Sequence, residues 1–350
     1  MTRLSLKTLS LWLAAVACFL AASISNAEAI QWVTVGDPGN APDTAPAGYG
    51  AVSTSFRIMK YEFTNQQYTD FLQSVAATSD PYSLYNANMG SNAVGGITRS
   101  GSPGNYSYSV KQYMGDKPVN YVSWLDAARV ANWYQNGATS LSSTETGAYT
   151  LNGAMLGGAA VNPGATFYLP TEDQWYKAAF YKGGNNNAGY WNFGTQRDTA
   201  PTTVTADSTG TGSAGLSSTA NSANYLSRAR WGGDAYGNVT TVGTNGGPGA
   251  YDTFDMSGNI SEWVSGASGH PDDARLRGGA FWEYDNYYVS SEYSQGMAAS
   301  GEDISSGFRL VSPASSPSSV PEIDPNSLGS VLALVLGSLG LLERRRLKVA

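Results

Sequence analysis

Residues 255–263 read Asp255-Met256-Ser257-Gly258-Asn259-Ile260-Ser261-Glu262-Trp263, the densest group of polar side chains in the chain. Carboxylates stand at both ends of a turn that contains glycine, and the carbonyls of such a turn can point the same way as the two acids. Hard cations such as Ca²⁺ bind shells made of oxygen, which this stretch can supply. The alternative interpretation is a tight turn that leads into a buried tryptophan, with both acids in solvent. The acidic spacing of an EF-hand is absent.

Helix starts are the clearest local signals elsewhere in the chain. Thr64-Asn65-Gln66-Gln67 is a capping box, in which a threonine and a glutamine satisfy backbone N–H groups reciprocally. Ser123-Trp124-Leu125-Asp126 and Thr171-Glu172-Asp173-Gln174 predict two further helices, each with an apolar face directed at the core. Short strands are predicted over residues 55–61, 166–169, 280–282 and 307–311.

The body from residue 30 to residue 312 is expected to be one domain without a fixed-period repeat. Three low-complexity segments, at 86–105, 139–164 and 200–222, are dominated by glycine, serine, threonine and asparagine. They predict surface insertions, because motif-bearing sequence resumes on both sides of each. With 41 glycines and 22 tyrosines but only 13% charged residues, the chain is expected to combine aromatic burial with long loops.

Residues 1–29 have the three-part layout of a secretory signal peptide. Arg3 and Lys7 precede an apolar run over residues 9–22, and small residues suited to cleavage follow. An N-terminal anchor helix is the less favoured alternative, because the run is too short to span a bilayer comfortably. The secretion machinery is therefore an expected partner, and the body is expected outside the cell.

The C-terminal end also has the features of a targeting signal. A Ser/Pro linker at 313–320 leads to a tail, residues 321–350, with a short apolar segment at 328–342 followed by arginines. Such arginines stay cytoplasmic, so the tail predicts a transient inner-membrane anchor. Val320-Pro321-Glu322, the apolar segment and the arginines resemble a PEP-CTERM sorting signal, although Ile323-Asp324-Pro325 replaces the usual second proline. The resemblance implies cleavage near Glu322 by an exosortase-like enzyme and delivery to the cell surface or extracellular matrix.

Charge and side-chain chemistry exclude several functions. Removal of residues 1–29 and 343–350 takes away six of 20 cations and two of 27 anions, so the body carries a net charge of −11. No basic stripe remains to neutralise phosphates, and nucleic-acid binding is not expected. The only cysteine is Cys18, in the signal peptide, and the only histidine is His270. These counts exclude a disulfide, a zinc cluster, a cysteine nucleophile and a multi-histidine site, and no G-x-S-x-G elbow supports a serine triad.

Six short motifs follow one another in a recognisable order. They are Lys60-Tyr61-Glu62-Phe63-Thr64-Asn65, Lys117-Pro118-Val119-Asn120-Tyr121-Val122-Ser123-Trp124, Leu169-Pro170-Thr171-Glu172-Asp173-Gln174-Trp175, Gly258-Asn259 with Glu262-Trp263, Leu276-Arg277-Gly278-Gly279 and Gly307-Phe308-Arg309. In this order the chain resembles the formylglycine-generating enzyme or sulfatase-modifying factor family over residues 30–312. The resemblance implies an α+β, C-type-lectin-like single domain with sparse secondary structure, and bound calcium.

The same resemblance assigns two sets of calcium ligands. The first set is Asp255 and Glu262 with the carbonyls of Gly258 and Ile260, inside the stretch quoted above. The second and weaker set is Asn224 and Asp234 with the carbonyls of Tyr225 and Tyr236. Both sets consist of oxygen donors, as calcium requires.

Catalysis does not carry over from the resemblance. The family's oxidase holds copper through two cysteines just beyond Arg-Gly-Gly, whereas residues 280–288 contain no sulfur here. Glu283 and Tyr288 stand near those positions, and neither replaces a soft thiolate pair for Cu(I). Relatives that use non-haem iron need several histidines. We therefore expect neither copper nor iron and assign no catalytic residue.

The leading functional hypothesis is an exported, catalytically degenerate binding module. Its tyrosine- and asparagine-rich loops would bind a glycan, a peptide or a matrix protein, since aromatic side chains with adaptable polar neighbours make workable binding surfaces. Two alternatives stay open. One is a formylglycine-generating-type oxidase or another extracellular enzyme on the same scaffold. The other is a structural matrix component that assembles without a ligand.

Overall fold

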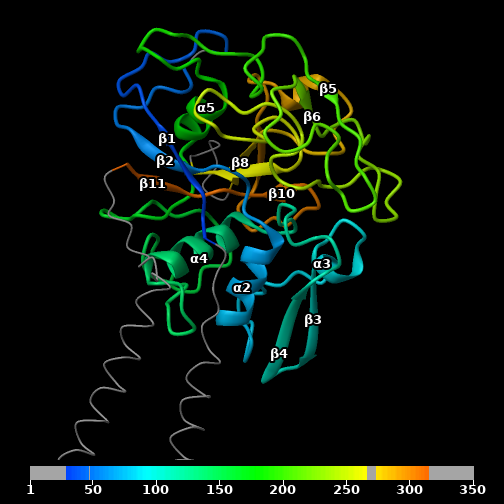
Figure 1. The fold of residues 1–350 in the computed structure, drawn as a ribbon. Helices are drawn as coiled ribbons and strands as arrows, with labels where there is room; N and C mark the ends of the chain where they lie inside the picture. The colour runs from blue at the N-terminus through cyan, green and yellow to red at the C-terminus, as the bar shows by residue number, and fades with distance from the viewer. Residues whose placement is uncertain (1–28, 47, 266–272, 315–350) are drawn as a thin grey trace, which may run out of the picture. The chain divides into compact units, whose positions relative to one another are not determined.

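The computed structural model describes residues 29–46, 48–265 and 273–314 (Figure 1). Most of the predicted signal peptide, His270 and the tail with Val320, Pro321 and Glu322 lie outside these ranges. Within them, no helix is long and apolar enough to cross a bilayer. Long irregular segments connect short helices and strands, so the predicted α+β class with sparse secondary structure is confirmed.

Three helices begin where the sequence predicts them. They are α2 (Asn65–Val75), α4 (Trp124–Gln135) and α5 (Glu172–Phe180). Each starts with a complete capping box, in which the side chains of Thr64, Ser123 and Thr171 accept from a backbone N–H one turn later. The box acts within four residues, which is why sequence alone places these starts. The short helices α3 (Asn88–Ser91) and η1 (Asn286–Val289) were not predicted.

The described strands form four small sheets. The first is antiparallel, with β2 (Phe56–Met59) between β1 (Trp32–Val35) and β11 (Val311–Pro313). The second has the order β10-β7-β8-β9, from β7 (Ser261–Val264), β8 (Asp273–Arg277), β9 (Gln295–Ala298) and β10 (Ser306–Gly307). The two-stranded sheets pair β3 (Ile97–Ser102) with β4 (Asn105–Val110) and β5 (Thr202–Thr203) with β6 (Ser222–Ala223). The first and last described strands thus share β2 as their partner.

Helices lie on both sides of the first sheet. Helix α5 lies on one side of it, and α2 and α4 lie on the other (Figure 1). Strand β7 divides its side chains between the same two cores, because Trp263 packs with α2 and α4 whereas Val264 packs with α5. This is the two-residue period of a strand. Glu262 consequently points toward α5, into an environment where charged residues are rare.

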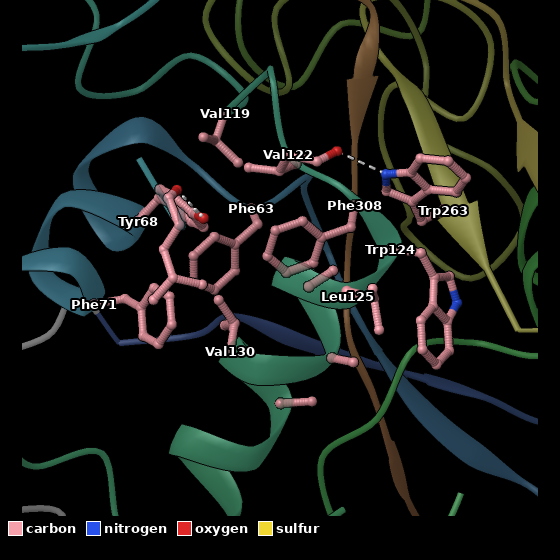
Figure 2. Close-up of a cluster of buried hydrophobic side chains, with 14 of the residues drawn as sticks. Phe63, Tyr68, Phe71, Val119, Val122, Trp124, Leu125, Val130, Trp263 and Phe308 are labelled. Carbon is pink, nitrogen blue, oxygen red and sulfur yellow. Dashed lines mark hydrogen bonds between the residues drawn. The ribbon is translucent and has the colours of Figure 1, made fainter. Parts of the chain in front are cut away.

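Aromatic rings fill the larger core (Figure 2). The ring of Phe63, just before α2, stacks on Phe308 with 4.7 Å between centroids. The indole N–H of Trp263 donates to the carbonyl of Val122 at 2.8 Å, so this buried ring keeps its hydrogen bond. Each such ring buries on the order of 150–250 Å². The rings therefore join segments that are far apart in sequence.

Three of the four predicted strands are wrong. Residues 166–169 make only an isolated bridge, between Tyr168 and Val311. Residues 280–282 form a turn, in which Phe281 is buried while its backbone bonds to loop residues rather than to a strand. A short apolar run indicates burial but does not determine backbone conformation. The predicted strand at 307–311 is wrong as well, because residues 308–310 form the irregular connection between β10 and β11. The predicted strand at 55–61 exists but is shorter, as β2.

The segment at 86–105, predicted as an irregular surface insertion, contains regular structure. It holds α3 and β3, and β3 pairs with β4 in a hairpin that projects beyond α2 (Figure 1). The backbone N–H of Tyr106 donates to the carbonyl of Ala77, just after α2, at 2.7 Å. Just after the segment, in β4, Tyr106, Tyr108 and Val110 alternate with serines, which is a strand signal.

Arg309 uses all five of its N–H donors inside the fold. Its Nε and Nη2 each donate to the carboxylate of Glu262 at 2.6 Å. The other donors reach the carbonyls of Met59, Lys60 and Phe254, at 3.1, 3.3 and 2.9 Å. One guanidinium therefore ties β7 to the end of β2 and to the segment that enters the 255–263 turn.

Glu262 extends this connection to a helix. Its carboxylate also accepts from the indole N–H of Trp175, in α5, at 2.8 Å. Glu262 and Arg309 are both completely buried. Two charges withdrawn from water are tolerated only when nearly every donor and acceptor is satisfied, as it is here.

Replacement of Arg309 tests this connection. Arg309→Met leaves Glu262 buried without its charged partner, so we expect the free energy of unfolding to fall by about 3–5 kcal/mol. Urea denaturation measures the change. Arg228→Met alters an exposed arginine and serves as the matched control, with an expected change within about 0.5 kcal/mol. A loss below about 1 kcal/mol for Arg309→Met would show that the pair does not hold these segments together.

Candidate functional site

Three residues of the 255–263 stretch have a left-handed backbone conformation. Asp255, Gly258 and Asn259 have φ values of 58°, 91° and 67°. A Cβ on Gly258 would lie 2.4 Å from the carbonyl oxygen of Asn224, so the close approach itself requires glycine. The backbone N–H of Asn259 donates to this same carbonyl at 2.8 Å. The turn is thereby fixed against the segment that follows β6.

Asn259 is the centre of a buried hydrogen-bond network. Its Oδ1 accepts from the backbone N–H and hydroxyl of Thr240, at 2.9 and 3.0 Å, and from the amide of Asn224 at 3.1 Å. Its Nδ2 donates to the carboxylate of Glu62 at 3.0 Å. All four side chains are almost completely buried. The side chain of Asn259 therefore connects three segments that are distant from one another in sequence.

Glu62 and Asp255 are two buried carboxyl groups that face each other. Asp255 accepts from the backbone N–H of Gly243 and from the amide of Asn245. Glu62 Oε2 receives no hydrogen bond from the described part of the chain. Two facing carboxyl groups are stable only when they share a proton.

Electrostatics indicate which acid holds that proton. Burial raises the pKa of Glu62 well above its usual value of 4.5, and the neighbouring charge of Asp255 raises it further. Arg309 opposes this rise, but Glu262 already pairs with Arg309 through both oxygens. Burial also raises the pKa of Asp255, whereas its hydrogen bonds from Gly243 and Asn245 favour the charged form. Glu62 is therefore the acid that stays protonated.

The first predicted calcium set does not fit a cation in this arrangement. Both oxygens of Glu262 bind Arg309, and both oxygens of Asp255 accept from protein donors. The carbonyl of Gly258 accepts from the backbone N–H of Ile260 at 3.0 Å. Across the described ranges, no three acidic, histidine or cysteine residues are grouped to hold a metal. In this arrangement the guanidinium of Arg309 is the positive charge that Glu262 binds.

Among the described residues, no hydrogen bond joins Asp234 or Tyr236 to Asn224 in the second predicted set. Tyr236 is largely exposed, and the described hydrogen bond to the Asp234 carboxylate comes from the backbone N–H of Tyr236. Asn224 is buried, and its Oδ1 lacks a hydrogen-bond partner in the described residues. Beside it lies Asn238, whose carbonyl accepts from the Asn224 amide at 2.9 Å. Sequence reasoning did not single out Asn238 as a neighbour of Asn224.

Asn238 is the better candidate ligand. It is completely buried, and within the described residues neither end of its side chain has a hydrogen-bond partner. A buried amide oxygen without a hydrogen-bond donor destabilises the folded state unless an ion or water satisfies it. Such an oxygen is a suitable ligand for a hard cation. Asn224 and Asn238, with neighbouring carbonyls, would hold calcium, whose role there would be to tie this loop to the turn. No local pattern in the sequence marks Asn238 or Glu62 as buried.

The segment after Arg277-Gly278-Gly279 carries an exposed group of aromatic rings. Tyr288 contacts Tyr284, Tyr287 and Tyr293, with centroid distances of 4.7, 5.6 and 4.8 Å. We refer to these four residues as the tyrosine cluster. Tyr284 is 75% exposed and Tyr287 47%, and the nearby Trp282 is 46% exposed. Tyr288 of this cluster, like Glu283, stands near the positions at which the family resemblance would require copper ligands.

Glu283 lies beside the tyrosine cluster and is half-buried. Burial raises its pKa to about 7, and the charge of Asp303 adds to the rise. The segment therefore presents phenol, indole and carboxyl groups. These groups can bind a ligand, but they are not soft-metal ligands.

These features define a loop-rich α+β domain of the C-type-lectin-like kind, held together by a buried ion pair and a buried amide network. The chain belongs to the family described as the sulfatase-modifying factor enzyme 1-like domain, whose model matches residues 32–314. This confirms the family expected from the six motifs. No curated protein sequence matches the chain.

Several solved structures are similar to this chain at low sequence identity. CarF is 22% identical, with 81% of this chain and 98% of CarF covered and a TM-score of 0.48. Treponema denticola variable protein 1 is 18% identical, with 81% and 95% covered and a TM-score of 0.46. PvdO from Pseudomonas aeruginosa is 16% identical, with 81% and 92% covered and a TM-score of 0.41.

The raised pKa of Glu62 predicts a pH dependence of stability. A carboxyl group with a raised pKa in the folded state contributes stability that is complete below pH 4.5 and is lost as the pH rises through the folded-state value. In Glu62→Gln the amide can donate to Asp255 at any pH. We therefore expect the wild type to lose more free energy of unfolding between pH 5 and pH 8 than Glu62→Gln does, by urea denaturation.

Glu292→Gln removes an exposed carboxyl group and is the control. Asp126 and Glu283, whose pKa values burial raises to about 7, contribute with the same sign in every variant. The informative quantity is therefore the difference between variants. Equal losses in the wild type and Glu62→Gln would show that Glu62 is ionised in the folded protein.

Calcium binding at Asn224 and Asn238 can be tested by thermal unfolding. At a calcium concentration 100 times the Kd, binding to the folded state alone stabilises a protein by ~2.7 kcal/mol, and a chelator removes this gain. Asn238→Ala deletes an amide that makes no hydrogen bond, so we expect it to abolish the calcium-dependent shift in Tm without disturbing the network. Asp234→Ala should retain the shift. Identical melting curves of the wild type in calcium and in chelator would rule the site out.

Proposed function

We propose that this protein is an exported, non-catalytic binding module of the cell surface or extracellular matrix. Its tyrosine cluster would contact a glycan, a peptide or a matrix protein. The observation that carries the proposal is the exposure of Tyr284, Tyr287 and Trp282 on one short segment. Large aromatic side chains supply contact area at low conformational cost and are enriched at binding surfaces.

The supply of side chains in the mature chain argues against the family's redox chemistry. Copper chemistry needs soft thiolates and non-haem iron chemistry needs several imidazoles. With Cys18 removed in the signal peptide, the chain keeps no thiol and a single imidazole, that of His270. The positions beyond Arg277-Gly278-Gly279 carry aromatic and acidic residues instead.

Buried side chains and backbone hydrogen bonds fix the segment that carries the tyrosine cluster to the domain. Phe281 and Val289 are buried on either side of the exposed residues. The carbonyls of Phe281 and Glu283 accept from the backbone of Ser227 and Leu226, at 2.9 and 2.8 Å. A surface held in place before binding loses little entropy when a ligand arrives, which supports a binding role.

Screening the purified protein against glycan and peptide arrays tests the proposal. Tyr284→Ala and Tyr287→Ala remove exposed rings, so we expect each to weaken binding of any array hit at least tenfold, about 1.4 kcal/mol, with little change in Tm. Tyr113→Ala removes a ring that is 52% exposed and lies outside the cluster, and it should bind normally. Conversion of a cysteine-bearing sulfatase peptide by the purified protein would overturn the proposal.

A further inference from the structure

The surroundings of the tyrosine cluster are acidic and contain no cation in their own segment. From residue 278 to residue 308 the chain has no lysine, arginine or histidine. The same segment has five acids, Glu283, Asp285, Glu292, Glu302 and Asp303. Aromatic rings and carboxylates therefore share one stretch of sequence that has no cation of its own. Arg275 and Arg277, in β8, reach it only at the hydroxyl of Ser294 and at the carbonyls of Ser291 and Tyr293, among the described hydrogen bonds.

The electrostatics of the cluster agree with this composition. Burial raises the pKa of Tyr293, and the charge of Glu283 raises it further. The hydrogen bond with Tyr284, then burial, and then the charges of Tyr284 and Glu283 raise the pKa of Tyr288. The charge of Asp303 likewise raises the pKa of Glu283. No cation opposes these effects among the charges that act on Glu283, Tyr288 and Tyr293.

Elsewhere in the described residues, paired tyrosines already hold an arginine. The guanidinium of Arg99 lies 4.6 Å from the ring centroids of both Tyr85 and Tyr106. Arg277 lies 4.6 and 5.3 Å from the rings of Tyr49 and Tyr176. The attraction of a cation to an aromatic face is worth about 0.5–1 kcal/mol when exposed and about 2 kcal/mol when desolvated.

The tyrosine cluster has the same chemistry as these pairs without the cation. Its exposed rings Tyr284 and Tyr287 have no described lysine or arginine above them. Glu283 stands beside the rings and can pair with a positive charge. A cation that docks there comes from outside the described residues.

We propose that the tyrosine cluster binds a basic segment of a partner protein, with an arginine or lysine against the ring faces and Glu283 as its counter-charge. This inference rests on the proposed binding function and names its ligand class. A net charge of −11 for residues 30–342 attracts such a segment from a distance. A neutral glycan could also stack on the rings but would gain nothing from the carboxylates.

The probe is a fluorescein-labelled peptide of Gly-Ser-Arg repeats, with Gly-Ser-Lys and Gly-Ser-Gln repeats as counterparts. Fluorescence anisotropy with the full-length protein should show binding of the arginine and lysine peptides and not of the glutamine peptide. Their affinity should fall as NaCl rises from 50 to 500 mM, because screening weakens charge attraction. Tyr287→Ala, Tyr284→Ala and Glu283→Gln should each weaken binding about tenfold.

Asp252→Asn is the matched control, because Asp252 is an exposed carboxylate outside the cluster. It should bind as the wild type does. Equal binding of the arginine peptide by all variants would show general attraction to an acidic protein and would overturn the inference. A neutral glycan that needs Tyr287 but not Glu283 would overturn the inference and leave the proposed function standing. If no ligand of either kind depends on the tyrosines, both proposals fail.

Discussion

The fold depends on one completely buried ion pair, Glu262 with Arg309. Removing two charges from water costs several kcal/mol per ion, and their attraction offsets this only when the geometry is good. Here every guanidinium donor has a partner, and those partners belong to β7, the end of β2 and the segment before the turn. Such a pair contributes less to the free energy of unfolding than to the selection of a single native fold. A fold with any of these segments misplaced would leave a buried charge unsatisfied.

Loops make up most of this domain, so their polar backbone must be satisfied by something other than sheets and helices. Asn259 shows how this is done, with one side chain that serves Thr240, Asn224 and Glu62. The guanidinium of Arg309 likewise satisfies backbone carbonyls, those of Met59 and Phe254. Side-chain amides and guanidinium groups thus replace strand ladders as the connection between distant segments.

Local signals in the sequence predicted the features that local interactions determine. The starts of α2, α4 and α5 follow from capping boxes within four residues, and the order of motifs sufficed to identify the family and fold class. Predictions failed where the partner is distant. Phe281 is buried like a strand residue but bonds to loops, and the hydrogen bond from the Asn224 amide to the carbonyl of Asn238 has no local signal in the sequence. The facing carboxyl groups of Glu62 and Asp255 are separated by most of the chain, so no sequence pattern reveals them.

In the segment that carries the tyrosine cluster, different residues stabilise the fold and form the exposed surface, whereas many proteins use the same residues for both roles. Phe281 and Val289 hold the segment in place, while Tyr284 and Tyr287 face outward and support little of the frame. Exchange of outward residues costs the fold little, since surface substitutions usually change stability by no more than about 0.5 kcal/mol. The outward positions can therefore diversify while the frame stays constant, so that one scaffold could acquire a repertoire of recognition specificities.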